Sequence, residues 1–415
     1  MKIFITTEDI KRNCLCLIFA LFILSSTLTA PWIMKLSLYI FTLVGLVYIE
    51  GFKKAIKSNF LNYSVYLLFI LLCLFSYLLL DSKDLKFSES PQIENMIALF
   101  ILFVFILVWR ESYSYFMNVL VFVTTLYLII SLPIHYFYFE SSLLSATAFF
   151  YPFESEALSN KNTLGILLSL CLPFCLFKLS NKVNFYNLFL VVLFNTAIFY
   201  TFSRAAFILS GITTLLFLFS FRTRLVKASL LSIFSSLMLL FIYDISPQKY
   251  NQLKSESNNQ VIEHNYAGYQ TNDIDLTNEP NKTFSSEGAR FNYIKLSVEG
   301  FFEKPLFGHG ITSFRKNHET LDVAGQIVRK PVTHNDFAQI LYEMGLLGLL
   351  SFLSLFIFNF LKVYRDSSLK SDESLTIFFQ LITLAIALNS GNYIDHSVFW
   401  TFMGITLLKI NRVPS

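Results

Sequence analysis

Charged residues are scarce in this chain of 415 residues, since only 14% are Asp, Glu, Lys or Arg. A soluble domain averages about 25%. Hydrophobic residues make up 54% of the chain, and Phe alone occupies 47 positions. The apolar residues come in runs of about 17–25, the length of helix that spans a bilayer. They do not alternate with polar residues as in the strands of a membrane barrel. The composition therefore predicts an all-α polytopic integral membrane protein.

The signals of several chemistries are also missing. No P-loop or dinucleotide-binding glycine pattern is present, so no nucleotide, other cofactor or nucleic-acid partner is expected. All five cysteines fall in apolar segments and none in the long polar loop, which favours core packing over disulfides or a thiolate metal site. His309 and His318 do not form a recognised metal spacing, so no metal is expected. The N-terminal apolar run has no evident signal-peptide cleavage site.

The apolar runs predict twelve transmembrane helices, near residues 14–30, 33–50, 60–80, 93–109, 115–136, 162–178, 185–202, 205–221, 228–243, 337–361, 374–390 and 397–410. Lys and Arg in short loops mark the cytoplasmic face, and here they fall on alternate loops. Both termini are therefore expected in the cytoplasm and the long polar loop outside. The expected division is N-terminal helices (1–184), helices with an outer turn at Arg204 (185–243), a large outer loop (244–336) and C-terminal helices (337–415).

The long outer loop has two parts. Residues 254–286 have few large apolar side chains and cannot bury enough surface to order well. From 287 to 303, by contrast, apolar residues recur at helical spacing. This pattern predicts an amphipathic helix on the outer membrane–water boundary, stopped by Pro305 and Gly308. Residues 306–310 are expected to form a turn.

Two arginines on the outer side are candidate anion ligands. Arg204 lies in a tight outer turn between two predicted spans, against the positive-inside bias. It is either a snorkelling interfacial residue or a phosphate ligand, since the guanidinium fork matches phosphate oxygens bidentately. Arg290 opens the predicted amphipathic helix and is either a solvated charge or part of an anion site. The C-terminal half of the outer loop is basic and would also suit anionic head groups.

His334 is the best single candidate for chemistry. We expect it in the first turn of a membrane helix, with Thr333 as the N-cap and Asp336 as its partner in a capping box. A helix N-terminus disfavours added positive charge, so the imidazole is expected to stay neutral and able to act as a general base. The alternative is a histidine that merely caps the helix. Gly345 and Gly348 are expected to serve close helix packing.

Three segments on the outer side occur in a recognisable order. They are Ser203-Arg204; Gly288-Ala289-Arg290 with Pro305-Leu306-Phe307-Gly308 after it; and His334-Asn335 followed by Gly345-x-x-Gly348. In this order and spacing they resemble the O-antigen ligase and O-antigen polymerase superfamily of bacterial envelope glycosyltransferases. The resemblance covers roughly residues 190–360, and the N-terminal helices match only in hydropathy.

The resemblance implies a multi-pass protein of the bacterial inner membrane, with its active site facing the periplasm. A glycan on undecaprenyl diphosphate would move onto a hydroxyl of lipid A–core in a ligase, or of another lipid-linked repeat in a polymerase. Arg204 and Arg290 would hold the diphosphate and His334 would activate the acceptor or position the donor. Asn335 and Asp395 are further candidates for binding substrate. The ligase branch is favoured.

A transporter of lipid or solute is the alternative from another class, and twelve helices suit it. Transporters place their sites near the bilayer midplane on broken helices, often with ionisable residues. Here the predicted spans carry little charge and the informative residues gather at the outer edge. The sequence therefore favours the enzyme.

Overall fold

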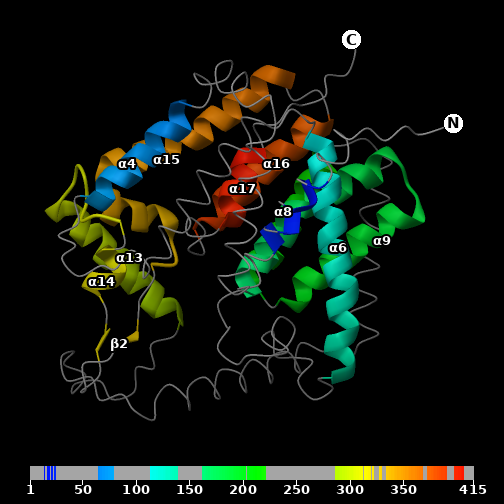
Figure 1. Cartoon of the computed structure of the whole chain (residues 1–415), viewed down its shortest axis with the longest axis horizontal. Helices are drawn as coiled ribbons and strands as arrows, with labels where there is room; N and C mark the ends of the chain where they lie inside the picture. The colour runs from blue at the N-terminus through cyan, green and yellow to red at the C-terminus, as the bar shows by residue number, and fades with distance from the viewer. Residues whose placement is uncertain are drawn as a thin grey trace.

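We describe the protein from a computed structural model (Figure 1). It describes residues 64–78, 113–138, 161–220, 286–321, 327–329, 333–367, 372–389 and 397–405, except 202, 312 and 319, together with part of 14–24. The helices are α4 (Ser64–Leu78), α6 (Tyr113–Tyr138), α8 (Lys161–Asn181), α9 (Phe185–Tyr200), α10 (Arg204–Ser220), α13 (Ser286–Glu303), α14 (Ser313–Asn317), α15 (Asp336–Ser367), α16 (Asp372–Ala387) and α17 (Ser397–Ile405).

These helices confirm the all-helical character of the predicted membrane protein. Within the described residues three segments are long and apolar enough to cross a membrane: Tyr113–Ile130, Leu164–Asn181 and Asp336–Arg365. The predicted spans near 33–50, 93–109 and 228–243 lie outside the described residues, and the one near 14–30 is described only in part. The number of twelve spans stays a prediction.

Helix α8 lies at the centre of the bundle, among α6, α9, α10, α16 and α17 (Figure 1). It is apolar on all sides, as expected of a helix enclosed by others. Buried polar groups tie its neighbours together. Gln380 on α16 donates its side-chain amide to the carbonyl of Leu170 at 2.7 Å and accepts from the Tyr113 hydroxyl at 2.8 Å. Such interhelical hydrogen bonds fix helix positions where the surrounding lipid offers no partner.

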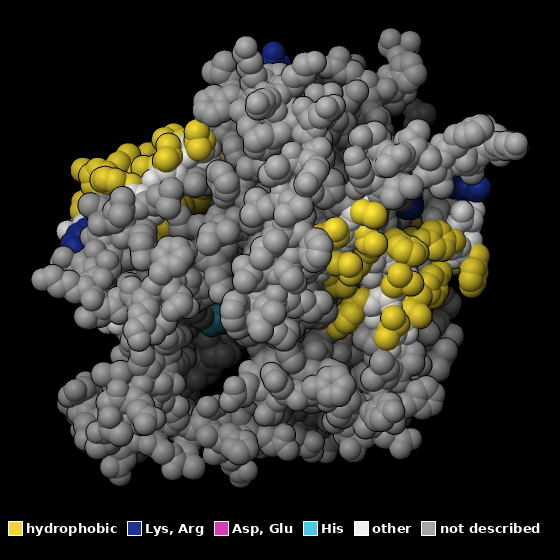
Figure 2. Space-filling model, viewed as in Figure 1, with side chains coloured by type: hydrophobic (Ala, Val, Ile, Leu, Met, Phe, Trp, Pro, Cys, Tyr) yellow, Lys and Arg dark blue, Asp and Glu magenta, His cyan; other side chains and the backbone are white. Residues whose placement is uncertain are grey.

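Two flanks of the molecule expose hydrophobic side chains (Figure 2). One lies over α4 and α15, which pack side by side, and the other over α6 and α9. Asn359 on α15 donates to the Tyr66 hydroxyl on α4 at 2.6 Å, which joins the two helices inside the bundle. The cysteines are free; Cys14 is exposed, and the other four are buried as predicted.

The segment predicted to form the long outer loop contains elements that were not predicted, namely α14 and a short hairpin. The helix predicted at 287–303 is confirmed as α13. Beyond α14, however, the strands β1 (Thr320–Leu321) and β2 (Ile327–Arg329) pair antiparallel, with Thr320 opposite Arg329. The sequence analysis did not predict this hairpin, because two or three residues are too few to show an alternating pattern.

Candidate active site

Arg204 is the first residue of α10, in the predicted tight turn after α9. Ser203 caps the helix, since its hydroxyl accepts from the Ala206 N–H at 3.4 Å. Helix α8 supports the turn closely: a Cβ added to Gly165 would lie 2.7 Å from the Cβ of Ala206 and 3.3 Å from that of Ser203. The Ser169 hydroxyl also donates to the Ala206 carbonyl at 3.1 Å. The backbone that carries Arg204 is therefore fixed by α8.

Arg290 lies near the start of α13, the element predicted to carry it. This helix packs against α15 through its smallest side chains. A Cβ added to Gly300 would lie 2.2 Å from the ring of Tyr342, so the ring can rest on the helix only because position 300 is glycine. His309 stacks on Tyr342 with ring centroids 4.5 Å apart, and its Nε2–H donates to the Gly300 carbonyl at 2.9 Å.

His334 precedes α15, and its placement differs from the prediction. The capping residue is Asn335, whose Oδ1 accepts from the Ala338 N–H at 3.0 Å. The prediction that Thr333 caps the helix is wrong; the Thr333 hydroxyl instead donates to the Asn335 carbonyl at 2.9 Å. His334 therefore lies one residue outside the helix. Its φ is 53°, and it is the one non-glycine residue with positive φ in the described part of the chain.

The two segments on either side of His334 are firmly held. Thr333 and Asp336 are fully buried, and the Asp336 N–H donates to the carbonyl of Leu388, just beyond α16, at 2.9 Å. The Asn335 N–H donates to the Thr333 hydroxyl at 3.3 Å. A left-handed conformation at a residue other than glycine costs about 1–3 kcal/mol and persists only where its surroundings impose it. His334, itself half-buried, is such a residue.

Helix α15 is broken at Gly345, where φ is 65° and ψ is −161°. In an unbroken helix, the N–H groups of Leu346 and Leu347 would bond to the carbonyls of Tyr342 and Glu343. Here residues 305–310 bond to all four groups. The contacts are His309 N–H to Tyr342 O (3.0 Å), Gly310 N–H to Glu343 O (2.7 Å), Leu346 N–H to Pro305 O (2.8 Å) and Leu347 N–H to Leu306 O (3.3 Å). We call this pairing of 305–310 with 342–347 the interlock.

Two glycines make the interlock possible. Gly308 lies against the segment that contains Gly345, and Gly345 lies against the segment that contains Gly308. A Cβ on Gly308, whose φ is 68°, would lie 2.5 Å from the carbonyl carbon of Glu343. A Cβ on Gly345 would lie 2.6 Å from the carbonyl carbon and oxygen of Leu306. The role predicted for Gly345 thus needs correction, because it breaks the helix rather than packing one helix on another. Gly348 makes room within α15 for Met344, whose Cβ would be 2.1 Å from an added Cβ.

The half of α15 before the break carries buried polar side chains that the sequence analysis did not single out. Asp336, Gln339 and Glu343 are at most 4% exposed and follow each other at spacings of three and four, which places them on one helix face. Gln339 Nε2 donates to Glu343 Oε1 at 3.3 Å. The spacing of three and four residues between these polar positions was the sequence signal that could have identified them. Polar residues buried in such a helix are functional candidates, and the first of these lies two residues after His334.

Arg204, Arg290 and His334 thus all lie at N-terminal ends of helices, namely α10, α13 and α15. The interlock joins the elements of the last two, since it fixes the end of α13 to the middle of α15. The meeting of the three side chains around one cavity stays a prediction. Asp395 and its neighbour His396 lie outside the described residues. No group of three or more potential metal ligands occurs in the part of the chain that the structure describes.

The three described segments that are long and apolar enough to cross a membrane indicate a helical membrane protein. Residues 188–353, about two fifths of the chain, match the family model described as O-antigen ligase (Wzy_C). This part of the chain, from α9 to the second half of α15, is therefore similar to a Wzy_C domain. The family covers O-antigen ligases and polymerases, which transfer glycans from lipid-linked donors. No curated protein matches the chain.

Proposed function

We propose that this protein is an O-antigen ligase of the bacterial inner membrane. It transfers a glycan from undecaprenyl diphosphate to a sugar hydroxyl of lipid A–core at the periplasmic face. The observation that carries the proposal is the imposed left-handed backbone of His334, inside the matched domain. Strained conformations of this kind gather at active sites, where the surrounding structure compensates for their cost.

In the proposed reaction the acceptor hydroxyl oxygen attacks the anomeric carbon of the donor sugar. His334 takes the hydroxyl proton, and the bond between the anomeric carbon and the diphosphate oxygen breaks. The bonding electron pair leaves with undecaprenyl diphosphate, so the donor itself supplies the leaving group and no nucleotide is needed. Arg204 and Arg290 hold the diphosphate and neutralise the charge that develops on it.

The interlock supports a shared site for Arg290 and His334. Transfer requires donor and acceptor groups to be held in a fixed relative position, and a misplacement of about 1 Å can cost roughly 100-fold in rate. Arg290 belongs to α13, which runs directly into 305–310, and His334 directly precedes the half-helix that ends at 342–347. Four backbone hydrogen bonds join these segments and fix the end of α13 to the middle of α15. Asn335 caps α15 and thereby helps to fix the backbone of the preceding residue, His334.

A polymerase is the second candidate, because the family includes both activities. The same residues would act on the same donor, and the acceptor would be a second lipid-linked repeat. The described residues do not distinguish these acceptors, so the experiment must do so.

The test is a lipopolysaccharide gel from a deletion strain, together with extraction of its lipid-linked glycans. A ligase predicts that the whole ladder disappears from lipid A–core while long polymer accumulates on undecaprenyl diphosphate. Cores that carry a single repeat would instead identify the polymerase. An unchanged ladder would contradict both and favour the transporter.

Complementation of the same strain tests the proposed residues. Arg290→Ala and His334→Ala should fail to restore the ladder at normal membrane levels. Arg365→Ala is the matched control, because Arg365 is exposed near the far end of α15 and should restore it. Full restoration by Arg290→Ala or His334→Ala would contradict the role assigned to that residue.

A further inference from the structure

Helix α13 has three different faces around its axis. Tyr293, Ser297 and Gly300 lie on one face, toward the neighbouring protein: Ser297 and Gly300 are buried, and Tyr293 packs edge-on against Phe314. The charged face carries Lys295 and Glu299, an exposed ion pair at 3.7 Å.

The third face is apolar and largely uncovered. Phe291 is 73% exposed and Phe302 is 74% exposed, and Val298 lies between them on the same side of the helix. Ile294 and Phe301, both half-buried, complete this face on the side next to the protein. A soluble surface rarely places five large apolar side chains together unless a partner covers them.

The position of this helix along α15 indicates what covers the apolar face. In the half of α15 before Gly345, residues 336–344, no side chain is exposed. Immediately after the break, Leu346, Leu347 and Leu350 are exposed, and the exposed stripe continues to Leu361. About 20 residues from Leu346 onward give roughly 30 Å of helix, the thickness of a bilayer core. The exposed apolar stripe of α15 therefore begins at the break at Gly345 and is long enough to face a bilayer core.

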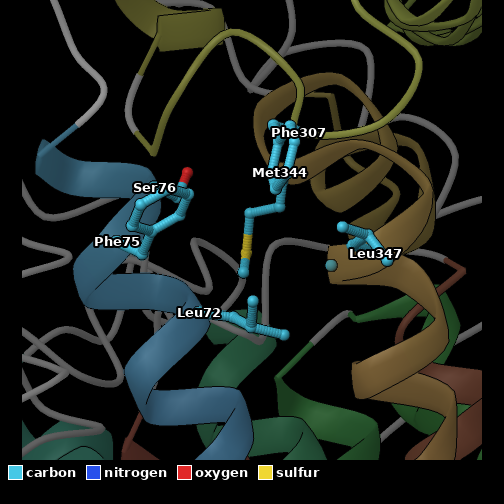
Figure 3. Close-up of a pocket in the computed structure, with 7 residues that line it drawn as sticks. Leu72, Phe75, Ser76, Phe307, Met344 and Leu347 are labelled. Atoms are coloured by element: carbon cyan, nitrogen blue, oxygen red, sulfur yellow. The ribbon is translucent and has the colours of Figure 1, made fainter.

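Helix α13 is attached to α15 at this level. Gly300 lies under Tyr342, and the loop after α13 forms the interlock at 342–347. Leu306 and Phe307 in that loop are exposed, and Phe307 meets Phe75 of α4 with ring centroids 5.8 Å apart. Figure 3 shows Phe307, side chains of α4, and Met344 and Leu347 of α15 around a small, mostly apolar hollow.

We propose that the apolar face of α13 and the tip of the loop after it lie in the lipid of the membrane that α15 enters. The face is continuous, through Leu306 and Phe307, with the lipid-facing stripes of α4 and α15. The charged face with Lys295 and Glu299 then lies toward water, as in helices that rest in the plane of a membrane surface. Helix α13 is an interfacial anchor of the catalytic domain.

The anchor would also set the depth of Arg290 relative to the membrane. This step rests on the proposed function. By the helical repeat, position 290 falls at the border between the protein-facing and lipid-facing sides of α13. At the membrane surface this border is the depth of lipid phosphates. The anchor would thus hold Arg290 at the level of the donor's diphosphate without lifting the carrier out of the membrane.

Spin labels at single cysteines test the anchor on the full chain in phosphatidylethanolamine–phosphatidylglycerol vesicles. Cys14→Ser supplies the background, because the four other cysteines are buried and should not react. Labels are placed by Phe302→Cys on the apolar face, Asn292→Cys on the charged side of the same helix and Leu350→Cys on α15. Collision rates are then measured with oxygen, which enters lipid, and with a water-soluble nickel chelate.

The proposal predicts that the label at position 302 resembles the one at 350, with frequent oxygen and rare nickel collisions, while position 292 collides mainly with nickel. Frequent nickel collisions at 302 would overturn it, because the face would then lie in water. Rare collisions with both reagents would also overturn it, because a second copy or another protein would then cover the face. The readout does not require transfer, so it is independent of the outcome for the proposed function.

Discussion

Replacing Gly345 by alanine tests whether the broken helix positions the active site. The backbone at Gly345 lies in a region that is essentially restricted to glycine, and another residue there costs about 1–3 kcal/mol. The new Cβ would also lie 2.6 Å from the carbonyl of Leu306, which is backbone and cannot rotate away. Relief requires the two segments to separate and to lose up to four hydrogen bonds, each worth about 0.5–1.5 kcal/mol.

If all four bonds are lost, the interlocked arrangement should therefore be destabilised by about 3–9 kcal/mol, taking the two contributions together. Alanine also favours an unbroken helix over glycine by roughly 0.5–1 kcal/mol. Straightening α15 would move the half-helix that carries His334 relative to α13. We expect membrane insertion to persist, because the apolar half beyond Gly345 is unchanged, and transfer to fall by about 100-fold or more.

The assay is glycan transfer by purified protein in vesicles, with thermal unfolding measured on the same samples. Gly308→Ala is a second variant, because it meets Glu343 from the opposite side of the interlock and leaves the backbone of α15 unchanged. Gly211→Ala is the matched control, since an added Cβ there has no atom within 4 Å. If both interlock variants transfer at the rate of the control, the break does not position His334 and the reasoning is wrong.

Other predictions concern single positions. Gly165→Val should displace the turn at Arg204 and lower transfer by about 10-fold or more. Arg204→Lys should keep partial activity, because it retains the charge but loses the bidentate fork. The transfer assay measures both variants. Asn335→Ala should lower stability by about 1 kcal/mol and Asn335→Asp should restore it, as seen by thermal unfolding; equal melting of both variants would refute the cap. Burial and the nearby His309 lower the pKa of His318 below 6.5, so the imidazole binds a proton more readily in the unfolded chain than in the folded one. The free energy of unfolding should therefore decrease as the pH falls below about 6.5. His318→Phe should weaken this pH dependence, as measured by thermal unfolding.

Much of the architecture was readable from the sequence because its signals are local. Apolar length and helical spacing placed α13 within one residue of its observed start, and the turn before Arg204 lies in the gap between two predicted apolar spans. The capping of α15 was less predictable, since Thr333, Asn335 and Asp336 are all suited to a helix start. Which of them caps depends on the backbone conformation of His334, and no residue preference reports it.

The sequence by itself determined the membrane class, the helical segments and the resemblance to glycan-transferring enzymes. These follow from hydrophobicity and motif order along the chain. Only the tertiary structure decided that Gly345 breaks α15 and that residues 305–310 bond to the freed groups. A glycine in a membrane helix suits close packing and a break equally well. The choice depends on whether a distant backbone segment can satisfy the exposed N–H and C=O groups, and that partner is apparent only when the chain is folded.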